Sequence, residues 1–310
     1  MPNVIVKNRS QVFGYYDHNM LVMSERISDH LPKTKKYSPK QRLWYIRAKE
    51  VIISSGSIER PLVFGNNDTP GVMLSSAAKE YLKVYGVLVG KNPLVFTNND
   101  SGYATAIEFK KNGISPIVLD TRKNPSSEII NEAKNLNIDI KFSHVVVAAK
   151  GYKKVKSADI AKISEDKKEL SQIENINCDC ICVSGFWIPT MHLASQSGNK
   201  TKFNEEIDAF IPSQPKQNET TLGSAKGVFT LEETLKTSFE KGFELSKKIT
   251  KKENKIATPS VLEKKSSVHD KFWCVPLPKG ANYKRFLDFQ NDVAVTDVQL
   301  ALREGYRSIE

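Results

Sequence analysis

The sequence predicts an α/β fold, and three observations support this prediction. Short apolar runs that read as buried strands alternate with segments of helical periodicity from residue 51 to residue 150. Residues 93–120 read as a strand, a helix and a strand, which predicts a parallel β-α-β unit. Two further apolar strands, at 51–53 and 180–183, run into a serine and a glycine and bracket that unit. This arrangement is typical of a fold with two dinucleotide-binding domains, in which such strands carry the chain out of the first domain and back.

Composition and charge narrow the class of protein. The 310 residues are 39% hydrophobic and 26% charged, as in a soluble globular protein with one large or two modest domains. No apolar run approaches the ~20 residues of a membrane helix, and the first residues lack a signal-peptide core, so we expect a cytoplasmic protein without membrane contact. The net charge of +11 comes mostly from lysines in turns and linkers, without interleaved aromatic residues, so we expect no nucleic-acid binding.

The elements before the β-α-β unit are short. Residues 28–40 are polar, contain proline and lysine, and predict a hairpin loop. Residues 51–53 form a fully apolar run, as in a buried parallel strand. From Gly71 the period changes, and apolar residues at helical spacing predict a helix that ends at Gly86.

The β-α-β unit consists of a buried strand at 93–97, a helix that ends at Gly113 and a strand that ends at Asp120. A short helix from residue 128 and further strands follow, among them a hairpin about Gly151. These neighbours read as antiparallel additions to a parallel sheet.

The C-terminal third is more irregular. Thr230 to Lys248 is predicted to be an amphipathic helix, with Thr230 and Glu233 as a capping box. The Lys- and Ser-rich residues 249–268 read as a linker, and residues 296–303 predict a last helix.

Three of the four cysteines, Cys178, Cys180 and Cys182, suggest either a metal motif or a strand. Alternate side chains on one face of a strand lie about 6.6 Å apart. Thiolates that share one zinc must lie within about 4 Å of each other. Three buried strand thiols are therefore the favoured interpretation, and we expect neither a metal site nor a disulfide framework.

The β-α-β unit carries a weak dinucleotide motif. Such motifs place glycines at the turn after the first strand, and an acid at the end of the second strand accepts a hydrogen bond from a ribose hydroxyl. Here Thr97, Asn99 and Gly102 occupy the three glycine positions, and Asp120 ends the second strand. Two of the three glycines are replaced, so a purely structural β-α-β unit is favoured over direct phosphate binding.

Arg60 and His192 each allow two interpretations. Arg60 either bridges to a phosphate or a neighbouring strand, or pairs structurally with Glu59 or Asp68, and the structural role is favoured. His192 is a candidate proton shuttle, but a hydrogen-bonded structural histidine is the favoured interpretation.

Several stretches together resemble the alpha subunit of heterotetrameric sarcosine oxidase. They occur in the same order along nearly the whole chain, and VFGYYDHN near the start belongs with them. The longer stretches are SSGSIERPLVFGNNDTPGVML, NPLVFTNNDSGYATA, CVSGFWIPTMHLASQSG and FLDFQNDVAVTDVQLALREGYRSIE.

The resemblance implies an oxidoreductase complex that demethylates sarcosine to glycine with formation of hydrogen peroxide. The one-carbon unit leaves as methylene-tetrahydrofolate or formaldehyde. Amine oxidation occurs at FAD on the beta subunit, and electrons pass to FMN at the alpha/beta interface. The alpha subunit holds NAD (or FAD) in a disulfide-oxidoreductase-like fold, and gamma and delta subunits complete the assembly.

The resemblance also implies the domain organisation. Residues 1–200 correspond to the dinucleotide-binding region, incomplete and with the β-α-β unit inserted at about 91–150. Residues 201–295 correspond to a small, mostly helical domain similar to a BFD-type iron–sulfur domain. Residues 296–310 begin a connection to a folate-binding domain. The family's first Gly-rich motif would precede Met1 and the folate domain would follow Glu310, so we expect an internal fragment.

Related dehydrogenase subunits carry the first cluster cysteines of that small domain as Cys-x-Cys. The corresponding residues here are Asp288, Phe289 and Gln290. Carboxylate and amide groups do not replace thiolates as cluster ligands, so we expect no Fe–S cluster.

These considerations give a set of expected cofactor-binding residues, none of which is expected to be catalytic. The first choices are Ser54, Ser55, Gly56, Arg60, Ser184 and Gly185. The second choices are Thr97, Asn98, Asn99 and Asp100. Alternative functions are a subunit of a related FAD/FMN opine, proline or glycine dehydrogenase complex, which the missing cluster cysteines disfavour, and a non-catalytic scaffold. The exact amine is left open, because another polypeptide contacts it.

Overall fold

The predicted parallel sheet is present in the computed structural model, which describes residues 4–251, 259–261 and 269–308. Its strand order is β6-β13-β7-β8-β9, and every neighbouring pair is parallel. The expectation of antiparallel neighbours beside the β-α-β unit is therefore wrong for β6, β9 and β13. The strands are β6 (Val72–Leu74), β13 (Cys180–Ser184), β7 (Pro93–Thr97), β8 (Ile117–Asp120) and β9 (Asp139–Phe142). Helix α2 (Ser101–Lys111) connects β7 to β8, which confirms the predicted β-α-β unit.

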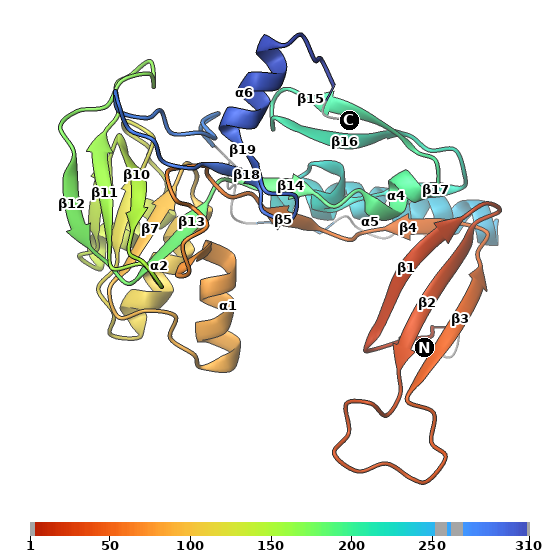
Figure 1. Ribbon diagram of the computed structural model, residues 1–310. Helices are drawn as coiled ribbons and strands as arrows, with labels where there is room; N and C mark the ends of the chain where they lie inside the picture. The colour runs from red at the N-terminus through yellow and green to blue at the C-terminus, as the bar shows by residue number, and fades with distance from the viewer. Residues whose placement is uncertain (1–3, 252–258, 262–268, 309–310) are drawn as a thin grey trace. The chain divides into compact units, whose positions relative to one another are not determined.

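Both faces of this sheet are covered (Figure 1). Helices α1 (Ser75–Tyr85), α2 and α3 (Glu128–Asn135) pack on one face. The other face packs on an antiparallel sheet of β10 (His144–Lys150), β11 (Ser157–Lys162) and β12 (Glu174–Asn177). Because both faces are buried, the central strands are apolar throughout rather than alternating. The turn between β10 and β11 contains Gly151, which confirms the predicted hairpin.

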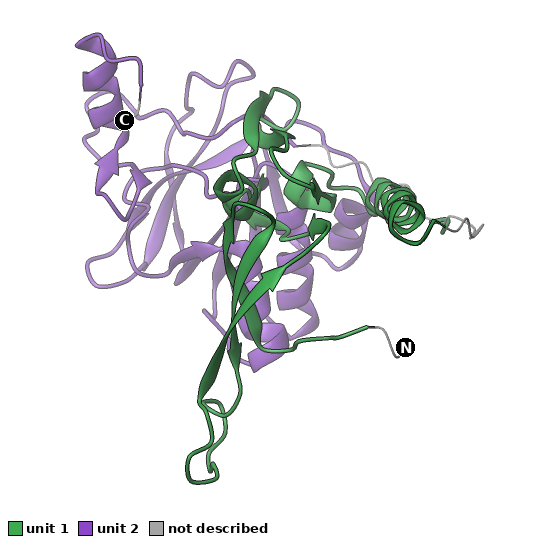
Figure 2. Cartoon of the chain, turned by 90° about the vertical axis from the view of Figure 1, so that its right-hand side faces the viewer, with its two compact units in different colours: residues 1–58, 188–266 green, residues 59–187, 267–310 purple. Residues whose placement is uncertain are grey.

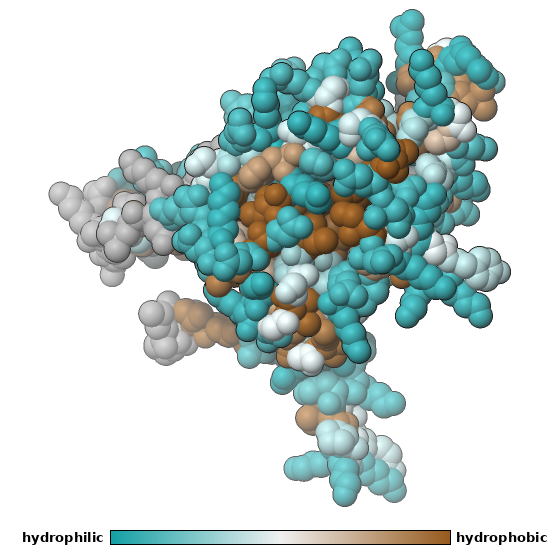
Figure 3. All heavy atoms as spheres, turned by 90° about the vertical axis from the view of Figure 1, so that its left-hand side faces the viewer, coloured by the Kyte–Doolittle hydropathy of each residue, from teal (hydrophilic) through white to brown (hydrophobic). Residues whose placement is uncertain are grey.

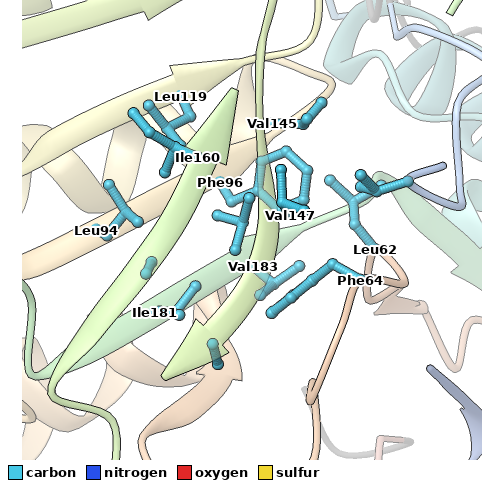
Figure 4. Close-up of a cluster of buried hydrophobic side chains, with 14 of the residues drawn as sticks. Leu62, Phe64, Leu94, Phe96, Leu119, Val145, Val147, Ile160, Ile181 and Val183 are labelled. Atoms are coloured by element: carbon cyan, nitrogen blue, oxygen red, sulfur yellow. The ribbon is translucent and has the colours of Figure 1, made fainter. Parts of the chain in front are cut away.

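The side chains of the central strands divide between two cores. Val95 of β7 belongs to the core beneath the helices, whereas Leu94 and Phe96 belong to the core shared with the antiparallel sheet. In that second core the rings of Phe64 and Phe96 meet edge to face, with centroids 5.9 Å apart. Figure 4 shows how its side chains converge from β7, β8, β10, β11 and β13.

The contacts within the chain define two compact units, coloured separately in Figure 2. Unit 1 comprises residues 1–58 and 188–266, and unit 2 comprises residues 59–187 and 267–310. The chain leaves unit 1 in β5 (Ser57–Glu59) and returns in β14 (Trp187–Pro189). Unit 2 contains the parallel sheet and, near the C-terminus, β18 (Phe286–Asp288), β19 (Val293–Ala294) and α6 (Val295–Arg303).

Unit 1 contains smaller sheets. An antiparallel sheet comprises β1 (Ser10–Tyr16), β2 (Met20–Arg26) and β3 (Gln41–Arg47), and the predicted loop at 28–40 joins β2 to β3. A parallel pair comprises β4 (Val51–Ile53) and β17 (Glu219–Thr221). The remaining elements are α4 (His192–Gln196), β15 (Lys200–Asn204), β16 (Ala209–Gln214), the 3₁₀ helix η1 (Gly223–Lys226) and α5 (Leu231–Thr250).

The predicted amphipathic helix is confirmed as α5, but its predicted capping box is wrong. The Thr230 side chain makes no capping hydrogen bond. Glu232 and Glu233 instead lie in the first turn, where carboxylates interact favourably with the helix dipole. A carboxylate does bond back to the N-cap backbone in α6, where Asp297 accepts the Ala294 N–H at 2.7 Å.

Residues 201–295, predicted as a small helical domain, contain β15, β16 and β17 in addition to α5, and contacts divide them between the two units. The domain boundaries at 200 and 295 stay predictions. The predicted linker falls partly outside the described residues. Among the described helices, none combines the length and the hydrophobicity that a membrane span needs.

Candidate functional site

Two parallel strands of unit 1 end side by side and form one candidate site. Strand β4 pairs with β17 so that Ile53 lies opposite Thr221, and the Leu222 N–H donates to the Ile53 carbonyl at 2.9 Å. Ser54, Ser55 and Gly56 follow β4, and Gly223 and Ser224 follow β17. Ligands of parallel α/β sheets bind at the carboxyl ends of the strands. This edge therefore has the right topology for a nucleotide.

The backbone at this edge turns sharply. The φ angles are 80° at Gly56, 64° at Gly223 and 86° at Gly227, in a backbone region that residues other than glycine rarely adopt. A Cβ on Gly56 would lie 4.0 Å from the Ser224 Oγ, so the two turns approach each other closely. Small residues at both turns leave space for a ligand near the backbone.

The predicted serines lie at the surface of this edge. Ser54 and Ser55 are exposed, and the Ser55 hydroxyl donates to the Thr190 carbonyl at 2.9 Å. The Thr190 N–H in turn donates to the Gly56 carbonyl at 3.0 Å, which fixes the turn. Sequence reasoning missed residues 223–227. Their signal was available, because the strand at 219–221 runs into Leu-Gly-Ser just as two other strands run into Ser-Gly.

A cleft of about 400 Å³ lies along β17 on its α5 side. Thr221 and Lys226 line it from one side, and Thr237 and Lys241 from the other. The Thr221 hydroxyl is buried and, within the described residues, has no hydrogen-bond partner. Glu219, Glu240 and Glu244 line the cleft as well, and Lys241 pairs with Glu244 at 2.8 Å. This flank of the candidate site is therefore polar and of mixed charge, which suits hydroxyl groups better than phosphate.

The second-choice residues lie in unit 2, at the turn between β7 and α2. Thr97, Asn98 and Asn99 are at most 1% exposed. The side-chain Oδ1 of Asn99 accepts the Ser101 N–H at 2.7 Å, and its side-chain amide donates to the Ser184 carbonyl at 3.0 Å. The structure thus brings these residues together with Ser184, and their polar groups bond to one another.

Gly102 is the one glycine of the degenerate motif that is kept, and close packing against Thr97 explains why. A Cβ on Gly102 would lie 2.7 Å from the Cβ of Thr97, closer than real side chains approach. The third glycine of a dinucleotide motif serves close packing between helix and strand. The helix therefore still needs its glycine, although the two phosphate-facing glycines are replaced by Thr97 and Asn99.

Asp120 is fully buried, and its carboxylate bonds to side chains of the same unit. The Tyr103 hydroxyl donates to its carboxylate at 2.7 Å, and Arg122 pairs with it at 2.8 Å. Arg122 also pairs with Asp100 at 2.8 Å. Burial, reinforced by Asp120, raises the pKa of Tyr103, so the phenol stays protonated and donates. Burial opposes the charge of Arg122, but Asp120 and Asp100 outweigh it and raise the pKa of Arg122.

Arg60 and Gly185 hold β13 to the start of unit 2. The Gly185 N–H donates to the Arg60 carbonyl at 2.7 Å, and the Arg60 N–H donates to the Phe186 carbonyl at 2.8 Å. The Arg60 guanidinium lies 4.1 Å from the ring centre of Trp273. Glu59 accepts the Ser76 N–H at 2.7 Å, at the start of α1.

The strand cysteines are buried and free, as the favoured interpretation predicts. The predicted spacing of alternate thiols is wrong, because the side chains of Cys180 and Cys182 lean together to a Sγ–Sγ distance of 3.7 Å. Among the described residues, no group of three or more His, Cys, Asp or Glu side chains could hold a metal. His192 is exposed at the start of α4.

Comparisons with known sequences show which proteins this chain is similar to. A family model described as "Sarcosine oxidase A3 domain" matches residues 282–310. The whole chain is 32% identical to sarcosine oxidase subunit alpha of Rhizobium meliloti and covers 30% of that protein. It is also 32% identical, over 97% of its length, to the same subunit of a Corynebacterium species, of which it covers 32%. The chain thus spans about a third of the length of these curated relatives.

Solved structures confirm the fold class. Bacillithiol disulfide reductase of Staphylococcus aureus matches 79% of this chain with a TM-score of 0.52 and 15% identity, over 71% of that chain. L-proline dehydrogenase of P. horikoshii matches 96% of this chain with a TM-score of 0.50 and 18% identity, over 52% of that chain. At such identities the likeness shows the fold alone.

Proposed function

We propose that this chain, which is related over its whole length to the alpha subunit of sarcosine oxidase, acts within an oxidoreductase complex of that type. The observation that carries this proposal is the 32% identity over all of the chain. The proposed reaction is oxidative demethylation of sarcosine to glycine, with hydrogen peroxide and either formaldehyde or methylene-tetrahydrofolate as further products. In this proposal the chain supplies a nucleotide-binding fold and subunit contacts, and its side chains perform no acid–base or nucleophilic step.

The proposed nucleotide, NAD or FAD, lies at the carboxyl edge of β4 and β17. Ser54, Ser55 and Gly56 support this proposal because they are at least partly exposed and adjoin the turn at residues 223–227. When bound, a pyrophosphate there would accept hydrogen bonds from backbone N–H groups and from serine hydroxyls. The sequence also predicts Arg60, Ser184, Gly185 and residues 97–100 as contacts, but their hydrogen bonds within unit 2 do not support this, and the proposal leaves them out.

The same proposal has two further parts. The chain holds no Fe–S cluster, and it contacts FMN at its interface with a beta-type subunit. Asp288, the first residue of the degenerate Cys-x-Cys position, accepts the N–H groups of Gln290 and Asn291 at 2.8 and 3.2 Å. These bonds use the carboxylate to form the turn between β18 and β19. A carboxylate that shapes a turn in this way supports a structural role for the position.

The surface offers contacts for beta, gamma and delta subunits. Tyr81, Val84 and Tyr85 of α1 and Leu88 after it are 40–67% exposed, although they are large and apolar. Figure 3 shows that hydrophobic residues also gather on one face of the molecule between hydrophilic ones. Contiguous exposed apolar surface marks sites of protein–protein contact.

Nucleotide titration of the purified chain tests the cofactor proposal, with duplex DNA as the control ligand. NAD or FAD should bind, and Ser224→Leu should raise the Kd at least about tenfold, because its side chain would fill the space beside Gly56. Thr34→Leu, in the exposed loop between β2 and β3, is the matched control and should leave the Kd unchanged. Failure of both nucleotides to bind, or tight salt-sensitive DNA binding, would contradict the proposal.

A substrate assay on the chain copurified with its native partners tests the reaction. Sarcosine should yield glycine and hydrogen peroxide. The alternative, a related complex that oxidises an opine, proline or glycine, has only the shared fold of L-proline dehydrogenase in its favour. Turnover of one of those amines in place of sarcosine would decide for the alternative.

A further inference from the structure

The carboxyl edge of the parallel sheet in unit 2 contains a topological switch point. From β7 the chain order proceeds through β8 and β9 on one side, while β13 and β6 lie on the other. In open α/β sheets the crevice at such a point receives the ligand. The crevice between β7 and β13 is therefore the place where this unit would bind a dinucleotide.

Hydrogen bonds bridge this crevice from strand to strand. The Asn98 N–H donates to the Ser184 carbonyl at 3.3 Å. The Asn99 amide donates to the same carbonyl at 3.0 Å and to the Ser184 hydroxyl at 3.2 Å. All three residues are at most 1% exposed, so the bridge lies beneath the surface.

A segment from the C-terminal part of the chain, His269–Phe272, covers the bridge. The Asp270 N–H donates to the Asn98 carbonyl at 2.9 Å. The Asn98 amide donates to the carbonyls of Asp270 and Phe272 at 2.8 and 3.2 Å. The Thr121 hydroxyl donates to the Asp270 carboxylate at 3.0 Å. The segment is thus bound to the ends of both β7 and β8.

Aromatic and ionic contacts hold the same segment on its other sides. The ring of His269 stacks on Phe186, just after β13, with centroids 4.0 Å apart. Lys167 forms an ion pair with Asp270. The segment therefore contacts the ends of all three central strands of the sheet.

The helix N-termini at this edge are occupied by the chain itself. At α2 the Ser101 N–H bonds to the Asn99 side chain, and at α1 the Ser76 N–H bonds to the Glu59 carboxylate, both at 2.7 Å. These are the groups that bind phosphate oxygens in a nucleotide site. A pyrophosphate at the start of α1 would also meet the carboxylate of Glu59, which already accepts the Ser76 N–H.

We propose that this edge is a self-closed nucleotide site. Residues 269–272, with the side chains of Asn98, Asn99 and Glu59, take the positions of a dinucleotide, and unit 2 binds none at its switch point. This inference goes beyond the proposed function, which places the nucleotide in unit 1.

Hydrogen–deuterium exchange of the full chain, with and without millimolar NAD or FAD, tests the closure. Exchange in peptides spanning 97–103 and 269–273 should be the same with and without nucleotide. Slower exchange of these peptides with nucleotide would overturn the inference. Protection at 54–57 and 223–227 alone supports both proposals, whereas protection nowhere supports closure and contradicts the proposed function.

A variant pair tests whether the segment is held as described. Asn98→Ala removes both side-chain bonds to the segment and should accelerate exchange in 269–273 by about tenfold or more. Asn112→Ala, an exposed asparagine at the end of α2, is the control and should leave that exchange unchanged. If Asn98→Ala does not fold, Thr121→Val gives the same readout. Equal exchange in the folded test variant and the control would overturn the inference.

Discussion

The Tyr103 hydroxyl donates a 2.7 Å hydrogen bond to the Asp120 carboxylate, and both side chains are fully buried. The bond joins α2 to the end of β8 and therefore braces the β-α-β unit across its own crossover. Arg122 binds the same carboxylate, at 2.8 Å. An acid at this position would contact a ribose in an open dinucleotide site, but here its contacts within the chain hold the unit together.

Removal of this hydroxyl should destabilise the protein. Tyr103→Phe keeps the ring in the core but takes one donor from a buried carboxylate, and a hydrogen bond to a charged group contributes about 1.5–3 kcal/mol. The free energy of unfolding, measured by urea denaturation, should fall by that amount. Tyr85→Phe is the control, because Tyr85 is 67% exposed on α1. If both variants unfold as the wild type does, the hydroxyl has no stabilising role.

The ion pair beside it should contribute more than surface pairs do. Arg122→Met leaves the Asp120 carboxylate buried without its cation, and breaking a buried pair costs about 3–5 kcal/mol. Lys111→Met breaks the exposed pair with Glu132, at 2.9 Å, and exposed pairs contribute at most about 1 kcal/mol. Urea denaturation of both variants gives the comparison, and equal losses would contradict the structural role of Arg122.

Local sequence patterns predict most of unit 2 correctly. The run at 93–97 is apolar at every position because the strand is covered on both faces, and its length and flanks identify it. Helix α1 is predicted by the helical spacing of its apolar residues and by Gly86, which follows the last helical residue with a φ of 64°. The strand cysteines are predicted as buried for the same reason as their apolar neighbours.

The roles of the turn residues depend on contacts far apart in sequence. Asn98 is polar and follows a strand, so it reads as a ligand residue, yet its amide bonds to Asp270, 172 positions away. No residue near Asn98 in the sequence indicates that Asp270 is its partner. The turn at 223–227 has a local signal, but its position beside the turn after β4 depends on a pairing between residues about 170 positions apart. Propensity does not encode such pairings.

Glu59 should make stability depend on pH. Burial raises the pKa of its carboxyl group, and hydrogen bonds from Ser184 and Ser76 oppose this only in part. The folded protein then binds the proton more tightly than the unfolded chain, whose value is 4.5. The contribution of Glu59 to stability is therefore complete below pH 4.5 and is lost as the pH rises through the raised folded value.

Glu59→Gln removes this titration. The free energy of unfolding of the variant, relative to wild type, should increase steadily as the pH is raised above 4.5. Each unit by which the pKa is raised corresponds to about 1.4 kcal/mol of that increase. Glu80→Gln, on the exposed side of α1, is the control for the substitution itself and should change the free energy of unfolding by at most about 0.5 kcal/mol. A constant difference between Glu59→Gln and wild type would refute the role of this carboxyl.

Two glycines in helices should respond oppositely to alanine. A Cβ at Gly102 would lie 2.7 Å from the buried Thr97 side chain, and overpacking of this kind costs about 1–3 kcal/mol. Gly242, in the interior of α5, has nothing within 4 Å of its Cβ position, so alanine there should add about 0.5–1 kcal/mol of helix stability. Thermal unfolding of Gly102→Ala and Gly242→Ala should therefore shift in opposite directions. A rise in both would show that helix and strand are not in close contact at Gly102.

The strand thiols should be inert in the native protein. Burial raises the pKa of Cys178 to about 12. The hydrogen bond with Cys180, together with burial, raises the pKa of Cys182. Only the thiolate attacks a disulfide reagent, so neither Cys178 nor Cys182 should react with DTNB near pH 8. Cys274 is only partly buried, and we expect it alone to react slowly.

Thiol counting distinguishes these residues. All four cysteines should react at once in urea, whereas native protein should release at most the equivalent of one thiol. Cys274→Ser should abolish the native reaction and leave three thiols in urea, because the remaining cysteines are buried in the strand region. Rapid release of two or more thiols from the native protein would mean that β13 is accessible. In that case the 3.7 Å approach of Cys180 and Cys182 would describe a reactive pair rather than core packing.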